Sequence, residues 1–201
     1  MKSKGMFKFV ISIFTVLLLL SGCSSKPSLD LVSATVEIRN DEGRLGGIGI
    51  TSGEKKGEII VPITLSYDFV LKNSGRKTIG GMEKLNSETY EYDDGIKVYI
   101  EPNENLQAVT KEVMGFNIYN EKGRKLAYLG IGETSSPVIE RNQEGKYTFD
   151  FDLGALEKNP EIRLAPSSEQ LEKLKEHAMD ATLIVSVEGE EIARFDLSNL
   201  D

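Results

Sequence analysis

The longest regular alternation of apolar and polar positions lies in VPITLSYDFVLK, residues 61–72. Apolar side chains occupy every second position from Val61 to Leu71. Because successive side chains of a strand point to opposite faces, this period of two predicts a half-buried β-strand. Pro62 has no backbone N–H, so we expect the strand to begin at a sheet edge or a bulge. The same alternation recurs at 96–100, 116–118, 147–153 and 183–187, and predicts a chain that is mostly β.

Two turn sequences predict hairpins. In TYEYDDGIKVYI, a loop of residues 93–95 places Tyr92 opposite Ile96 and pairs apolar side chains. Gly95 then occupies the left-handed position of a type I turn with a bulge. In VSVEGEEIARFDL, the alternation aligns Val187 with Ala193 and predicts a closing hairpin near the C-terminus, whose turn type stays open.

One segment, APSSEQLEKLKEHAMD, departs from the β pattern. Ser167 is placed to cap a helix, and Gln170 three residues later completes a capping box. The apolar residues that share one helical face are Leu171, Leu174 and Ala178. We therefore expect one short helix, at about 167–179, before the last two strands.

Short strands, turns and antiparallel hairpins together predict an antiparallel β-sandwich of immunoglobulin-like architecture. The stretch around FVLKNSGRKTIGG resembles the strand and turn of small immunoglobulin-like domains in Gram-positive lipoproteins. The Cys, Trp, Cys core of antibody domains is absent, because the chain contains no tryptophan.

The N-terminal pattern is of another kind. Residues 1–8 carry three lysines and no acid, and residues 9–20 are apolar or hydroxyl-bearing. This order is typical of an export leader, and the apolar run is shorter than the about 20 residues that a spanning helix needs. The following Leu20-Ser21-Gly22-Cys23 resembles the lipobox of bacterial lipoproteins. The resemblance implies cleavage between Gly22 and Cys23 and a diacylglycerol thioether on Cys23.

We therefore divide the chain into a cleaved signal peptide, 1–22, a lipidated tether, 23–28, and a single β-sandwich domain, 29–201. The alternative for Cys23 is an ordinary thiol beside a conventional cleavage site. Lipidation consumes the thiol of Cys23, so no disulfide is then possible. This agrees with the presence of a single cysteine in the sequence. Two acyl chains give durable anchoring, whereas one chain gives only marginal binding.

The charge of the mature chain limits its partners. The leader holds three of the 24 basic residues and none of the 32 acids, which leaves a formal charge of −11 after cleavage. Such a charge repels phosphate backbones and anionic headgroups, so we expect no nucleic-acid partner and no polybasic membrane patch. We expect the protein to contact the membrane through its N-terminal lipid.

Candidate chemistry is sparse. His177, the only histidine, lies on the predicted helix and is interpreted as solvent-exposed. A Cys/His zinc site is excluded, and no motif of a serine hydrolase, zinc protease or P-loop is present. Asp150, Asp152 and the pair Asp93-Asp94 could offer oxygen ligands to calcium but lack EF-hand spacing, so we interpret them as outward-facing strand and turn residues. We expect no catalytic residue, no metal and no cofactor.

Glycines cluster in DEGRLGGIGITSGEKKG, residues 41–57. A phosphate-binding loop would precede a helix, whereas the long strand follows here, so we expect a mobile β-hairpin or a flexible loop. Loops at the end of a sandwich often bind partners. This makes Arg44, Lys55 and Lys56 the candidate binding residues, with an envelope protein or wall material as the possible partner.

These observations favour a non-catalytic binding module, lipid-anchored on the extracytoplasmic face of a bacterial cell membrane. The alternative is a cell-envelope enzyme, or an accessory to one, that acts on wall or polysaccharide material through carboxylates. A solute-binding lipoprotein ranks last, because the alternating βαβ patterns of two-lobed binding proteins are missing.

Overall fold

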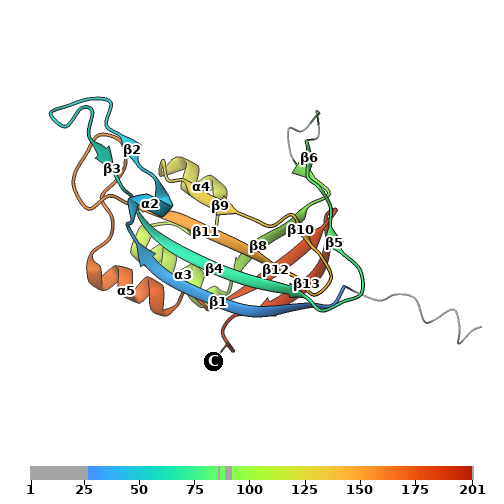
Figure 1. Cartoon of the computed structure of the whole chain (residues 1–201). Helices are drawn as coiled ribbons and strands as arrows, with labels where there is room; N and C mark the ends of the chain where they lie inside the picture. Colours follow the sequence, from blue (N-terminus) through green and yellow to red (C-terminus); the bar gives the residue numbers. More distant parts are fainter. Residues whose placement is uncertain (1–26, 86, 89–91, 201) are drawn as a thin grey trace, which may run out of the picture.

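The computed structural model describes residues 27–85, 87–88 and 92–200 (Figure 1). The predicted signal peptide 1–22, the cleavage site at Gly22 and Cys23, and the tether up to residue 26 lie outside the described residues. Within the described residues, no helix is long and apolar enough to cross a membrane.

The first antiparallel sheet has four strands in the order β1-β4-β11-β9. Their bounds are β1 Leu29–Arg39, β4 Ile63–Asn73, β9 Ile131–Thr134 and β11 Glu144–Gly154. The predicted strand at 61–72 is confirmed as β4, which pairs with β1 on one side and β11 on the other. Pro62 lies just before this central strand, and the pairing with β11 shifts register between Asp152 and Gly154, opposite the first residues of β4. The irregularity expected at the start of the strand is therefore present. The alternating residues Leu65, Tyr67, Phe69 and Leu71 are at most 1% exposed.

The second antiparallel sheet has three strands in the order β13-β12-β8. Their bounds are β8 Ile96–Pro102, β12 Ala181–Val187 and β13 Glu190–Asp196. The closing hairpin is confirmed, but its predicted register is wrong: Val187 faces Glu190, and Ala193 faces Val185. The two-residue turn Glu188-Gly189 has positive φ at both positions, 52° and 79°, as a type I′ turn requires.

The predicted hairpin at 93–95 is also wrong. The short strand β7 (Tyr92–Asp93) pairs with β6 (Lys84–Leu85), while Ile96 begins β8, which pairs along its whole length with β12. Asp94, rather than Gly95, has the left-handed backbone, with φ of 70°. The long ladder with β12 pairs the apolar residues of β8 with those of another buried strand, and this outweighs a local hairpin.

Two further pairs of short strands lie at opposite ends of the molecule. β2 (Ile48–Gly49) and β3 (Ile59–Ile60) form the β-hairpin that the glycine-rich segment predicts. β5 (Ile79–Gly80) pairs with β10 (Val138–Ile139) near the start of β1 (Figure 1).

The predicted helix is confirmed as α5 (Ser168–Glu176), with Ser167 as N-cap and a complete capping box to Gln170. The expectation of a single helix is wrong. The others are α2 (Glu42–Leu45), α3 (Glu104–Met114) and α4 (Glu121–Leu126). The predicted strand at 116–118 is wrong as well, because this segment is a turn that follows the left-handed cap of α3 at Gly115.

Both sheets and the helices α3 and α5 contribute to one hydrophobic cluster. Tyr67, Phe69, Phe149 and Phe151 stack or meet edge to face across β4 and β11, with ring centroids 5.8–6.5 Å apart. Such packing stabilises the domain through buried apolar area.

Candidate functional site

A cavity of about 830 Å³ lies at the end of the molecule where β1 begins. Three separate segments line it: Pro27 and Ser28 before β1, residues 73–80 after β4, and residues 187–192 around the β12–β13 turn. Figure 1 shows β5, the start of β1 and this turn at the same end. The volume falls within the roughly 300–1,000 Å³ that is usual for small-molecule sites.

Asn73 builds the wall formed by residues 73–80. Its buried side chain donates from Nδ2 to the carbonyl oxygens of Lys77 and Ile139, at 2.7 and 3.0 Å. Its Oδ1 accepts a hydrogen bond from Gly75 N at 3.0 Å. Because the three bonds fix the turn from inside the protein, this wall is formed before any ligand binds.

Two further contacts complete the frame of the cavity. Ser74 N donates to the carbonyl oxygen of Ser28 at 3.0 Å, and the two hydroxyl groups lie 2.8 Å apart. Gly80 has φ of +78°, and a Cβ atom there would lie 2.2 Å from the carbonyl oxygen of Pro137. Only glycine fits this position.

The cavity walls differ in charge. Exposed Arg76 and Lys77 belong to the wall after β4, and exposed Glu188 and Glu190 belong to the β12–β13 turn. Apolar contacts come from Pro27, Ile79, Val187 and Ile192. The cavity therefore combines an apolar lining with one basic and one acidic side.

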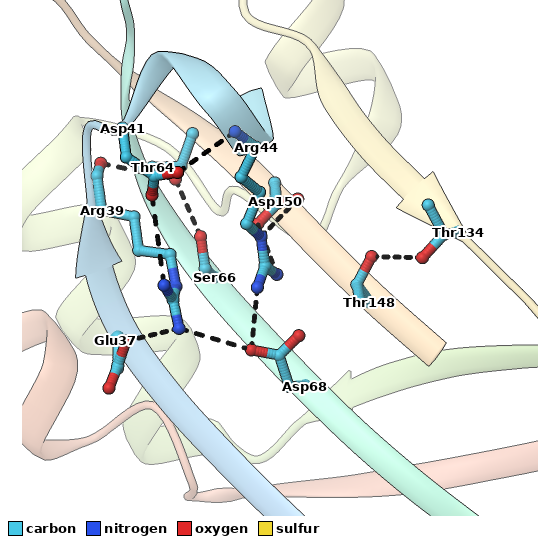
Figure 2. A network of polar contacts seen from close by, with 10 residues as sticks. All are labelled: Glu37, Arg39, Asp41, Arg44, Thr64, Ser66, Asp68, Thr134, Thr148 and Asp150. Carbon is cyan, nitrogen blue, oxygen red and sulfur yellow. Dashed lines mark hydrogen bonds and ion pairs between the residues drawn. The ribbon is translucent and has the colours of Figure 1, made fainter. Parts of the chain in front are cut away.

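The predicted binding residue Arg44 lies elsewhere, on α2 against the first sheet (Figure 2). Its guanidinium donates to Asp68 Oδ2 from Nη1 and to Asp150 Oδ1 from Nη2, both at 2.9 Å. The hydrogen bond to Asp68 raises the pKa of Arg44 above its ordinary value. Arg39 also reaches Asp68 Oδ2, at 3.6 Å. Arg44 thus fastens α2 to β4 and β11, and its charge is satisfied inside the molecule.

The other two predicted binding residues lie in the β2–β3 hairpin, at the end of the molecule opposite the cavity (Figure 1). Lys55 forms an ion pair with Glu157, and Thr51 donates from N and Oγ1 to Glu161 at 2.7 and 2.8 Å. These contacts tie the hairpin to the loop after β11, while Lys56 is exposed. The structure does not gather Arg44, Lys55 and Lys56 into one patch, and their role in binding stays a prediction.

The candidate acids have structural partners. Asp150 binds Arg44, and Asp94 lies 3.1 Å from Lys84 Nζ. Asp152 Oδ2 accepts a hydrogen bond from Gly130 N at 3.0 Å. Across the described ranges, no group of three or more His, Cys, Asp or Glu side chains is arranged to hold a metal ion.

His177 is half-buried, whereas we expected a solvent-exposed residue. It forms the C-cap of α5, and its Nδ1 lies 2.9 Å from Asp180 Oδ2. Asn105 Nδ2 donates to the same carboxylate oxygen at 2.6 Å. The three side chains link the end of α5 to the start of α3.

Sequence reasoning missed the cavity. The Asn73-Ser74-Gly75 sequence is a turn signal, and Glu188-Gly189 is another. Neither shows that the two turns lie side by side in the fold. Comparison of the chain with protein-family models, with curated proteins and with solved structures gives no match.

Proposed function

We propose that the protein is a non-catalytic binding module, held by a lipid on Cys23 at the extracytoplasmic face of a bacterial cell membrane. The observation that carries this proposal is the position of the cavity beside Pro27 and Ser28. Cys23 precedes Pro27 by four residues. Four extended residues span at most about 15 Å, so the cavity of an anchored molecule opens close to the membrane surface.

We also infer an immunoglobulin-like sandwich. In chain order, the seven longer strands are β1, β4, β8, β9, β11, β12 and β13. If they are lettered A to G, the sheet orders β1-β4-β11-β9 and β8-β12-β13 become ABED and CFG. These are the two sheets of constant-type immunoglobulin domains.

This correspondence supports a binding role for the cavity. Residues 73–80 then belong to the B–C connection, and residues 187–190 to the F–G connection. In antibody variable domains, these two loops are part of the binding end of the sandwich. The cavity lies at the equivalent end of this molecule.

The alternative, an envelope enzyme, is less well supported. A carbohydrate-cleaving pair needs two carboxyl groups that flank one cleft, roughly 5–10 Å apart. Asp68 and Asp150 do lie on one sheet face, but both bind the guanidinium of Arg44. Their arrangement favours a structural role.

Replacement of the lipobox cysteine tests the anchor. Cys23→Ala removes the thiol that would accept diacylglycerol, so we expect the variant to keep residues 1–22 and to carry no acyl mass. Intact-protein mass spectrometry of membrane and soluble fractions measures both properties. Ser24→Ala, which leaves the lipobox unchanged, should mature like the wild type. Normal cleavage and acylation of Cys23→Ala would refute the proposal.

A further inference from the structure

We infer that the cavity at the start of β1 binds the headgroup of a membrane phospholipid that carries both a phosphodiester and a primary ammonium group, as phosphatidylethanolamine does. This inference deepens the proposed function and rests on it, because the lipid anchor brings the cavity to the membrane. The ligand class follows from the charges of the two walls, from the apolar lining and from the chain length to Cys23.

The basic wall suits a phosphodiester. Arg76 and Lys77 are adjacent and exposed at the cavity. Guanidinium and ammonium groups form short, charge-assisted hydrogen bonds with phosphate oxygens. The hydroxyl groups of Ser28 and Ser74 also line the cavity and share one hydrogen bond, which leaves one of their two protons to donate to a phosphate oxygen.

The acidic wall selects among phospholipids. Glu188 and Glu190 offer carboxylates to a primary ammonium group, which has three N–H donors. A choline headgroup has no N–H to donate, and a purely anionic headgroup brings no positive charge to this wall. An ethanolamine headgroup satisfies both walls at once.

The apolar lining suits the part of the lipid that lies next to the headgroup. Ile79, Val187 and Ile192 offer contacts to the glycerol carbons and the first acyl methylenes. The wall held by Asn73 is already in place, so binding requires little ordering of that part of the protein. A water-soluble headgroup without acyl chains lacks these apolar contacts and binds less tightly.

The test uses the mature lipoprotein in nanodiscs that contain equal amounts of phosphatidylethanolamine, phosphatidylcholine and phosphatidylglycerol. Native mass spectrometry then identifies the phospholipid that stays bound to the released protein. We expect phosphatidylethanolamine to be enriched roughly tenfold over phosphatidylcholine, the effect of about one charge-assisted hydrogen bond.

Charge reversals assign this enrichment to the cavity. The double variant Glu188→Lys/Glu190→Lys should lose the preference for phosphatidylethanolamine and retain phosphatidylglycerol instead. The double variant Arg76→Glu/Lys77→Glu should retain neither lipid. Glu172→Lys/Glu176→Lys, an equal change of charge to that of the glutamate reversal at exposed positions on α5, should behave like the wild type. Thermal unfolding of each variant verifies that it is folded.

Several results would overturn the inference. The first is that the wild type retains the three phospholipids in the proportions present in the nanodisc. The second is that both double variants enrich phosphatidylethanolamine as strongly as the wild type does. Displacement of the bound lipid by an equal concentration of glycerophosphoethanolamine would exclude a membrane lipid as the ligand. The mass of the acylated N-terminus is read in the same spectra, so failure of the anchor is distinguished from failure of the cavity.

Discussion

The hydroxyl group of Tyr67 makes a buried polar contact within the core. Tyr67 is fully buried, and its hydroxyl donates to the carbonyl oxygen of Ala178 at 2.8 Å. Tyr119 must then donate to Tyr67, since the two hydroxyl oxygens are 2.5 Å apart. Burial raises the pKa of both phenols, so both stay protonated in the physiological range. The pair links β4 to the segments that follow α3 and α5.

Tyr67→Phe should therefore destabilise the domain by about 1–2 kcal/mol, because the buried carbonyl oxygen of Ala178 and the hydroxyl group of half-buried Tyr119 both lose their hydrogen bond to Tyr67. Urea unfolding measures the change. Tyr99→Phe removes a hydroxyl from a residue that is 47% exposed and should change the free energy of unfolding very little. Equal effects of the two substitutions would contradict this account.

Asp152 provides a prediction about pH. Burial raises the pKa of its carboxyl, although the hydrogen bond from Gly130 N opposes the shift. The folded state then holds this proton more tightly than the unfolded state. The carboxyl consequently favours folding below its unfolded pKa of about 4, and that contribution is lost as the pH rises through the folded pKa.

Asp152→Asn should accordingly be more stable than the wild type at pH 7, and the gain should disappear below about pH 4. Urea unfolding at several pH values checks the sign. Asp196 serves as the opposite case, since hydrogen bonds from Ser198 lower the pKa of its carboxyl. Asp196→Asn should lose stability at pH 7, so a gain there would show that the sign is wrong.

Among the elements, those with strict period-two patterns could be predicted from sequence. β4 and β11 were predictable because each buries one complete face, and α5 because Ser167 and Gln170 mark its start. α3 was missed although Asn103 caps it and Leu106, Val109 and Val113 line one face. Directly after α3, the alternating apolar residues Phe116 and Ile118 suggested a strand, but two alternating residues are too few to define a period.

The two hairpins failed for different reasons. The predicted register of the closing hairpin implies a loop of residues 188–192, whereas the chain turns within the two residues Glu188-Gly189. A bulge at Ile192 then shifts the pairing by one further residue. The hairpin predicted at 93–95 does not form, because β8 pairs instead with the distant strand β12. Rules for pairing between neighbouring segments do not consider such distant partners.

The inward face of β4 can be tested by a pair of adjacent substitutions. Phe69 is 1% exposed, and its ring lies 6.2 Å from that of Phe149. Phe69→Ala should destabilise the domain by about 3–5 kcal/mol. Val70 points to the other face and is half-buried, so Val70→Ala should destabilise by about 1 kcal/mol or less. Chemical denaturation compares the two, and similar losses would show that the faces are not distinct.

At the scale of the whole molecule, the two ends differ. One end carries the cavity, the start of β1 and the β12–β13 turn, and the other carries the β2–β3 hairpin and α5 (Figure 1). Sequence could indicate the turns of each end, because Gly, Asn and Ser mark them. It could not show which turns meet, because the cavity joins segments that are more than a hundred residues apart.

Cysteine labelling can test the orientation that we propose. In a lipid-anchored molecule, a cysteine in place of Thr78 lies at the membrane end, and one in place of Lys56 lies at the far end; both positions are exposed. A membrane-impermeant maleimide should label Lys56→Cys several-fold faster than Thr78→Cys in spheroplasts. After solubilisation in detergent the two rates should become similar. Faster labelling of Thr78→Cys in spheroplasts would contradict the orientation.

The pairing of β1 with β4 has a mechanical consequence for a tethered protein. β1 begins at Leu29, directly after the predicted tether, and its ladder with β4 extends to Arg39. A force between the anchor and a partner held at the far end would act along this strand. It would load the hydrogen bonds in shear, so that many of them share the tension and must break together. If the protein is anchored through Cys23 as we propose, the domain would therefore transmit a pull from a partner to the anchor without peeling open from its first strand.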